Sequence, residues 1–409
     1  MRVSWPLITG LAVRNLTRNL RRTLITSGAV ISGVAVLIIG YGLMDGLDEN
    51  VIRAQEDAVA GHVILRPAAY PDDGISHPIA AAEPVGDALE AALSADSRVV
   101  AWAPRLWFQS RLIHGADAVR VKGIAYDPAS EDAVFPRGDW ELDGAWPTGP
   151  GEVALGSGLA RMLSVEPGAS VVLEARTRPG ALNALPFTVS GVVSAHSPAV
   201  DALSVWMPLE TAETLVLPGD ARSHVAVRLK RRSQADDAAA DLGVGGWTAH
   251  TAVEEVAGLL ALNAFRRQAV SLIVFILMAI AATGIANTVI MAAYERVREV
   301  GTLRAMGMSQ AAVRALFIIE GAMLGLFAGL LGAALGAGTV AWFSTNGIDI
   351  GWVVNSLGEV SMSTLLYMHF SWRPVLGAIG FGLVISLLAS LWPAQHAASL
   401  NPADAVRAD

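Results

Sequence analysis

Four long apolar stretches dominate the pattern of hydrophobic and polar positions along the chain. They cover residues 24–44, 266–293, 315–343 and 373–393. Each is long enough to cross a bilayer as a helix, which takes about 20 predominantly apolar residues. The pattern therefore predicts an α-helical membrane protein with four transmembrane helices. Residues 1–23 are expected to form an N-terminal interfacial helix, and residues 394–409 a tail.

The first apolar stretch has an alternative interpretation as a secretory signal peptide. The hydrophobic region of a signal peptide is only about 7–15 residues long and ends at a small-residue cleavage site. Here no charge occurs from Leu24 to Leu43, and the stretch ends in Tyr41-Gly42-Leu43. We therefore expect an uncleaved first span.

One large polar region, residues 45–265, separates the first span from the second. Short runs rich in β-branched residues, bounded by Pro and Gly clusters, predict strands at 62–65, 119–123, 170–173, 187–193 and 224–229. Helical patterns interrupt these runs at 84–93, 157–163 and 234–242. The region is thus predicted to be an α+β extracytoplasmic domain inserted between transmembrane helices 1 and 2. Residues 251–267 form an amphipathic pattern that continues into the second span without a proline.

The distribution of charge gives the topology. Charged residues make up 16% of the chain, below the roughly 25% of an average soluble domain. The region 45–265 is acidic, whereas Arg residues gather in the segments that four spans would leave inside. We expect the loop 294–314 and both termini to be cytoplasmic, and the loop 344–372 to be external. Arg266 and Arg267, at the outer end of the second span, depart from this rule.

The loop 294–314 carries a dense set of charges between two spans. These charges belong to Glu295, Arg296, Arg298, Glu299 and Arg304. A linker needs no such set to fold, so we interpret it as a docking surface for a cytoplasmic partner. The four-residue spacing of the two Glu residues would place them on one helix face. Two glycines, Gly301 and Gly307, can bend or end a helix there.

The third span contains glycines in two runs with a spacing of four. They are Gly321, Gly325 and Gly329, followed by Gly332 and Gly336. Small residues at this spacing share one helix face and let a neighbouring backbone approach closely. The alternative is the ordinary enrichment of glycine in membrane helices. Because the runs are phased, we favour close helix packing.

The sequence contains few signs of catalytic chemistry. It has no cysteine, so it has no disulfide and no thiolate ligand. A G-x-x-x-x-G-K-[ST] phosphate loop, a G-x-S-x-G elbow and an H-E-x-x-H pair are all absent. The acidic polar region also disfavours nucleic acid as a partner. We expect a non-catalytic protein that binds no metal and no cofactor directly, with an enzyme as the alternative from another class.

At the docking loop the sequence resembles a known family. The segment E-R-V-R-E-V-G-T-L-R-A-M-G at 295–307, followed by I-I-E-G-A-M-L-G-L at 318–326, is similar to the signature of FtsX-like permeases. These are the membrane subunits of MacB- and Lol-type ABC transporters. Two more segments are similar to the external-domain and C-terminal patterns of this family: G-E-V-A-L-G-S-G-L-A at 151–160, and W-P-A at 392–394 with N-P-A-D-A-V-R at 401–407.

The resemblance implies a permease subunit that dimerises with a second copy or a paralogue and binds a separate cytoplasmic ABC ATPase. ATP and Mg would bind to that ATPase. The docking loop would be the coupling helix, with Leu303 and Ala305 also in its signature. By the same resemblance, ATP-driven closure of the ATPase pair moves the external domains.

The resemblance leaves three cargo classes open. Asp45-Gly46-Leu47 and Gly61-His62-Val63-Ile64 look closest to the lipoprotein-releasing LolC/LolE branch. We therefore favour extraction of lipoproteins or lipid-linked cargo from the bacterial inner membrane. The alternatives are tripartite efflux of drugs or peptides, and signalling that regulates cell-wall hydrolases. A periplasmic chaperone or adaptor and the lipid bilayer are further expected partners.

Overall fold

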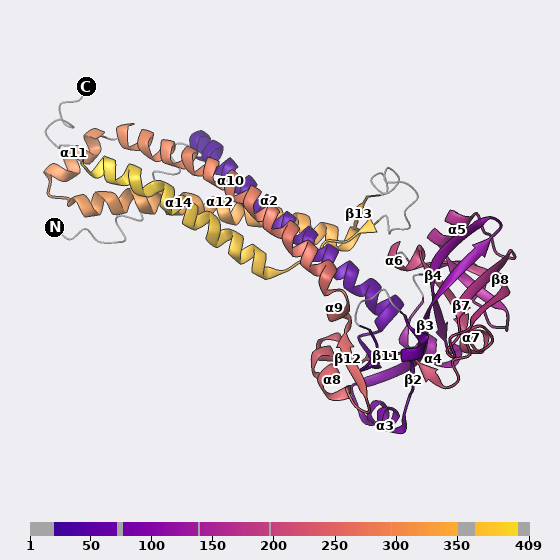
Figure 1. Cartoon of the computed structure of the whole chain (residues 1–409). Coiled ribbons are helices and arrows are strands. Elements are labelled where there is room, and N and C mark those ends of the chain that lie inside the picture. Colours follow the sequence, from indigo (N-terminus) through magenta and orange to yellow (C-terminus); the bar gives the residue numbers. More distant parts are fainter. Residues whose placement is uncertain are drawn as a thin grey trace. The chain divides into compact units, whose positions relative to one another are not determined.

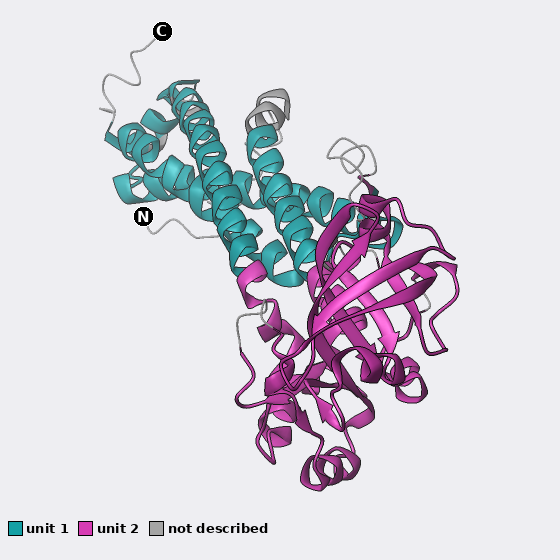
Figure 2. Cartoon of the chain, turned by 45° about the vertical axis from the view of Figure 1, so that its right-hand side comes forward, with its two compact units in different colours: residues 1–48, 261–348, 367–409 teal, residues 49–260, 349–366 magenta. Residues whose placement is uncertain are grey.

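The computed structural model describes residues 20–71, 77–137, 140–195, 198–295, 297–350 and 365–399. The chain forms two compact units, which Figure 2 distinguishes by colour. Unit 1 comprises residues 1–48, 261–348 and 367–409. Unit 2 comprises residues 49–260 and 349–366.

Long helices build unit 1 (Figure 1). They are α2 (Leu20–Gln55), α10 (Ala257–Glu295), α12 (Gln310–Asn346) and α14 (Trp372–Ser399), with the short α11 (Val297–Ala305) between α10 and α12. Each of the four long helices is apolar enough to cross a membrane. The prediction of four transmembrane helices is therefore confirmed, while the limits of the embedded segments stay predictions.

The packing of α10 follows the apolar pattern of its sequence. Val274, Met278 and Ala281 are buried, at spacings of four and three residues that place them on one face of the helix. Phe265 and Leu272 are among the large apolar side chains that remain more than half exposed. An apolar outer surface of this kind suits contact with lipid or with another membrane helix.

The amphipathic stretch before the second span forms two helices. Thr251 and Glu254 form a capping box at the start of the short α9 (Ala252–Glu255). The helix is interrupted at Val256, after which α10 continues for 39 residues. The predicted continuity into the second span is therefore confirmed from Ala257 onward.

A mixed ten-stranded sheet is the framework of unit 2. Its order is β12-β1-β11-β3-β4-β9-β6-β8-β5, and β7 pairs with both β3 and β8. The strands are β1 (Val63–Pro67), β3 (Val99–His114), β4 (Asp117–Tyr126), β5 (Glu141–Gly144), β6 (Glu152–Gly156), β7 (Ser170–Arg176), β8 (Leu182–Ser194), β9 (Ser204–Pro208), β11 (His224–Leu229) and β12 (Trp247–Thr251). Helices accompany them, namely α3 (Asp87–Ala95), α4 (Pro128–Val134), α5 (Ser157–Leu163), α7 (Leu209–Val216) and α8 (Ala235–Leu242). The predicted α+β domain between the first two long helices is confirmed.

All five predicted strands form, as parts of β1, β4, β7, β8 and β11. The sequence pattern missed β3, the longest strand, which has 16 residues. Both faces of β3 are buried from Arg105 to Phe108: Leu106 and Phe108 lie in one apolar cluster and Trp107 in another. The strand also carries Arg105 in its interior, so it has neither the alternation of a half-exposed strand nor a continuous apolar run.

Candidate coupling site and its connections

The predicted docking surface lies on two helices. Glu295 is the last residue of α10, whereas Glu299 lies in α11, which begins at Val297. Arg296 lies outside the described residues, so its part of the prediction has no structural counterpart. Glu295, Arg298 and Glu299 are all exposed.

Residues of α11 also face inward and hold the helix in place. Val300 is 6% exposed and belongs to an apolar cluster with Val313 of α12 and Ala397 of α14. The neighbouring Gly301 is buried as well. Arg304 is partly buried, and its Nη1 donates to the carbonyl oxygen of Ala398 at 3.3 Å. The Arg residues of the loop thus differ: Arg304 ties α11 to α14, and Arg298 lies on the exposed surface.

Turn residues determine where α11 ends and α12 begins. Of the remaining predicted residues, Ala305 is exposed and ends α11, and Leu303 lies within α11. Gly307 has φ of +98°, a conformation that residues with a Cβ rarely adopt. The side chain of Ser309 then caps α12 by accepting a hydrogen bond from the backbone N–H of Ala312. This turn separates α11 from α12.

The glycines of α12 pack against two different helices. A Cβ added to Gly321 or Gly325 would meet Ser390 or Ser386 of α14, and Gly329 lies near Ile379 of the same helix. By contrast, a Cβ on Gly332 or Gly336 would meet the backbone of α2 at Ile31 or Ala35. The two runs read from the sequence therefore correspond to two helix interfaces, which lie on α14 and α2.

A polar clamp joins α2 and α10 in unit 1, and sequence reasoning missed it. Arg267 of α10 donates from Nη1 to Asp45 Oδ1 at 2.8 Å and from Nη2 to Asp48 Oδ2 at 2.6 Å. Asn263 donates to the other oxygen of Asp48 at 2.8 Å. These partners explain why an Arg occurs at the N-terminal end of the second span, which the charge distribution predicts to be external. Its departure from the positive-inside rule was the signal that could have found the clamp.

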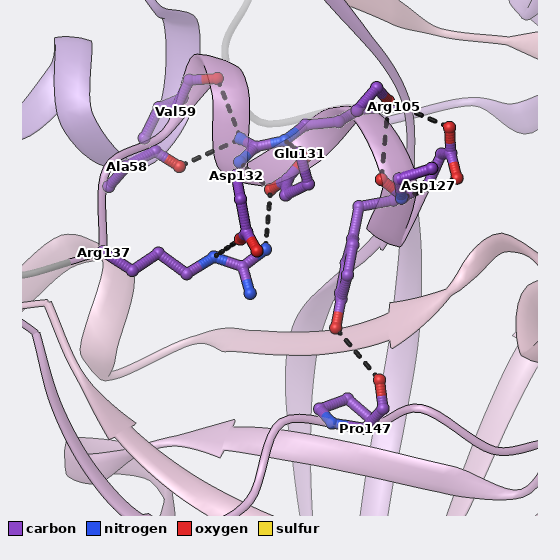
Figure 3. Close-up of polar contacts among 11 residues, drawn as sticks. Ala58, Val59, Arg105, Asp127, Glu131, Asp132, Arg137 and Pro147 are labelled. Carbon is purple, nitrogen blue, oxygen red and sulfur yellow. Dashed lines mark hydrogen bonds and ion pairs between the residues drawn. The ribbon is translucent and has the colours of Figure 1, made fainter.

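A second connection fixes the end of α2 inside unit 2 (Figure 3). The helix passes into a π-helical turn, η1 (Glu56–Ala60). Arg105 of β3 is 1% exposed, and its Nη1 donates to the carbonyl oxygens of Ala58 at 2.9 Å and Val59 at 3.1 Å. Its Nε and Nη2 both donate to the carboxylate of Glu131 in α4. One buried guanidinium thus joins the turn, the central strand and α4.

Further charges surround this buried pair and the end of α2. Arg137 lies 3.5 Å from Glu131 and stacks 3.9 Å from the ring centre of Trp146. Arg232 binds the carboxylates of Glu49 and Glu56, at 2.8 Å in each case. Because the contacts of Arg232 link positions more than 170 residues apart in the sequence, no local sequence pattern predicts them.

No group of three or more His, Asp or Glu side chains in the described part of the chain could hold a metal ion. What the geometry offers is a helical surface at the α10–α11 junction and a set of firm connections between helices.

Two family models match the chain. The MacB-like periplasmic core domain matches residues 23–243, and the FtsX-like permease C-terminal region matches residues 271–402. The first of these covers more than half of the 409 residues. The chain belongs to the family with the MacB-like periplasmic core domain. It is an ABC transporter permease of the FtsX/MacB/LolC family and a multi-pass membrane protein.

Relatives of this permease align over very different lengths. The lipoprotein-releasing system transmembrane protein LolC of Xylella fastidiosa is 26% identical over 392 residues, 92% of this chain and 91% of that protein. An uncharacterised ABC transporter permease of Methanocaldococcus jannaschii is 28% identical over 157 residues. The macrolide export ATP-binding/permease protein MacB 2 of Aeromonas hydrophila is 26% identical over 233 residues. The permease spans only 35% and 34% of the lengths of these last two proteins.

Solved structures similar to the permease include an extracellular domain. The domain of the ABC-type transporter YknZ from Gram-positive bacteria aligns with 46% of this chain and 99% of its own length. The TM-score is 0.32 and the sequence identity is 15%.

Proposed function

We propose that this permease couples ATP hydrolysis by a separate cytoplasmic ATPase to movement of unit 2, and thereby extracts lipoproteins or lipid-linked cargo from the bacterial inner membrane. The observation that carries the proposal is the alignment over 92% of the chain with a relative named as part of a lipoprotein-releasing system. In this proposal the ATPase holds ATP and Mg, both chain termini are cytoplasmic, and a second permease copy or paralogue completes a dimer.

The geometry of α11 supports a docking role. A surface that transmits motion must present side chains to its partner and must also be held firmly from behind. Arg298 and Glu299 are exposed, whereas Val300 is buried between α12 and α14. Arg304 adds a hydrogen bond to the end of α14. Displacement of α11 by a partner would therefore be passed to both of these helices.

Two long helices support the transmission of motion. Helix α2 extends from unit 1 residues to unit 2 residues without interruption, and so does α10. The Arg267 clamp holds the two helices together within unit 1. Within unit 2, Arg105 binds the turn that ends α2. A buried, multiply bonded side chain resists displacement, so the end of α2 should move together with the sheet.

Reversal of charge on the docking surface should weaken docking of the ATPase without preventing insertion of the permease into the membrane. The substitution Arg298→Glu is expected to weaken binding of the partner ATPase by about tenfold or more, because an attractive contact becomes repulsive. The measurement is ATPase binding and ATPase activity with the permease reconstituted in lipid. Arg373→Glu is a matched control, since Arg373 is also exposed but lies at the start of α14. Equal effects of the two substitutions would contradict the assignment of the surface.

The cargo assignment has its own test. Depletion of the permease in its native host should leave lipoproteins in the inner-membrane fraction, because extraction is the step it would perform. Fractionation of labelled lipoproteins on a density gradient measures this directly. Normal lipoprotein sorting, combined with raised sensitivity to drugs or peptides, would refute lipoprotein extraction and favour efflux.

A further inference from the structure

Unit 2 contains hydrogen-bond donors that have no acceptor in the described part of the chain. Trp107 of β3 is 5% exposed, and its indole Nε1 makes no hydrogen bond. The Nζ atom of Lys122 in β4 lies 4.5 Å from the centre of the Trp107 ring. Trp107 pairs with Ile124, two residues from Lys122, so both side chains project from the same face of the sheet.

A third donor lies beside this pair. Ser204 of β9 is the register partner of Lys122, and it is fully buried. Its hydroxyl group has no hydrogen-bond partner in the described residues. An unpaired buried polar group costs about 1–3 kcal/mol. Donors without acceptors on three neighbouring strands therefore indicate a binding site for a ligand that supplies the acceptors.

The charges around these donors leave an excess of positive charge. Arg105 is paired with Glu131, and Arg66 lies 3.2 Å from Glu255. Lys122 has no ion pair among the described residues, and its Nζ lies over the face of the Trp107 ring. An anion is the ligand that would balance this charge.

The aromatic neighbours of Lys122 add no negative charge. The ring of His224 lies 3.7 Å from the ring of Trp107, centre to centre. Burial, followed by the nearby charges of His77 and Lys122, holds the pKa of His224 well below its ordinary value. The imidazole can be neutral or positively charged but never negative, so it cannot serve as a counter-ion for Lys122.

A lysine at this position is itself unusual in the chain. Only Lys122 and Lys230 are lysines among the 29 basic residues, and all the others are arginines. An ammonium group is a compact cation with three donors, whereas a guanidinium is a broad planar fork.

We propose that Trp107, Lys122 and Ser204 form a binding site for a small oxyanion, namely a phosphate or carboxylate group. The indole N–H and the ammonium can only donate hydrogen bonds, so the ligand must supply several acceptor oxygens. Charge-assisted hydrogen bonds to such oxygens are stronger than neutral ones. The site lies in unit 2, apart from the docking surface, and the proposal does not depend on which cargo is transported.

The indole N–H of Trp107 provides a direct readout. The full chain, labelled isotopically at its 11 tryptophans and reconstituted in lipid nanodiscs, is titrated with inorganic phosphate. The indole signal that disappears in Trp107→Phe belongs to Trp107, and phosphate is expected to shift it. Lys122→Met should weaken the affinity by about tenfold or more. Lys230→Met, which replaces the exposed second lysine, should leave the titration unchanged.

A comparison of two phosphate compounds identifies the source of the ligand. Glycerol phosphate that binds more tightly than inorganic phosphate would assign a lipid headgroup as the source, whereas the reverse order would assign free phosphate. Either order supports the site. The proposal is overturned if phosphate shifts no Trp107 signal, or if Lys122→Met and Lys230→Met weaken binding equally.

The pH dependence gives an independent check. Burial first and Arg105 second lower the pKa of Lys122 to about 8, against the opposing influence of Glu255. The lysine is thus charged below this pH and loses its charge as the pH rises through it. Sulfate keeps the same charge over this range, so its affinity should fall between about pH 7 and about pH 9. A flat profile would contradict the role of Lys122.

Discussion

Replacement of Arg105 by methionine is expected to lower the free energy of unfolding of unit 2 by about 3–5 kcal/mol. The substitution keeps much of the side-chain volume but removes the guanidinium. Glu131, which is 1% exposed, would then lose its closest counter-ion. The carbonyl oxygens of Ala58 and Val59 would lose their donor at the same time. Thermal and denaturant-induced unfolding of the full chain in detergent, followed by tryptophan fluorescence, measures the loss.

Arg111 supplies the matched control for this experiment. It lies on the same strand and also pairs with a glutamate, but its side chain is 52% exposed. Exposed ion pairs contribute at most about 1 kcal/mol to stability. Arg111→Met should therefore change the free energy of unfolding very little. Similar losses from the two substitutions would show that burial of the Arg105 pair has no special importance.

A double substitution separates the charge from its packing. In Arg105→Met combined with Glu131→Leu no lone buried carboxylate is left, so much of the stability should return. If the connection to η1 also transmits motion, this double variant should regain its fold but not full coupling to the ATPase. Full recovery of both stability and coupling would limit Arg105 to a role in folding.

The main architecture could be predicted because its signals are local. Each long helix is an uninterrupted apolar stretch, and each of the five predicted strands is a run of β-branched residues between turn residues. The docking segment was recognisable for the same reason, since its charges and glycines lie within 20 residues of one another. Local composition is sufficient when the residues that define a feature are neighbours in sequence.

The connections could not be predicted, because their partners meet only in the folded chain. Arg105 finds Glu131 on one side and the end of α2 on the other. Arg267 finds two aspartates more than two hundred residues earlier in the sequence. The departure of Arg267 from the positive-inside rule indicated that this side chain has a special role, but it did not identify the aspartates as its partners. Arg105 offered no signal apart from a charge in a strand that the sequence pattern did not predict.

Substitution of Gly332 by alanine is expected to lower the stability of unit 1 by about 1–3 kcal/mol. A Cβ at this position would lie 2.6 Å from the carbonyl oxygen of Ile31 and 2.9 Å from the Cβ of Val34. Both atoms are held close to the backbone of α2 and cannot rotate away, so the helices themselves would have to separate. Thermal unfolding of the full chain, followed by circular dichroism, measures the cost.

Two other glycines of α12 test whether the sequence motif or the contact with α2 causes the loss of stability. Gly329 belongs to the same phased pattern, but its added Cβ would come no closer than 3.6 Å to Ile379, an ordinary contact distance. Gly338 has no atom within 4 Å of the added Cβ. Alanine favours a helix over glycine by about 0.8–1.0 kcal/mol, so both substitutions should be neutral or stabilising. Loss of stability at Gly332 alone would show that close approach of α2 sets the requirement for glycine. An equal loss at Gly332 and Gly329 would contradict it, because the spacing pattern would then matter more than the contact.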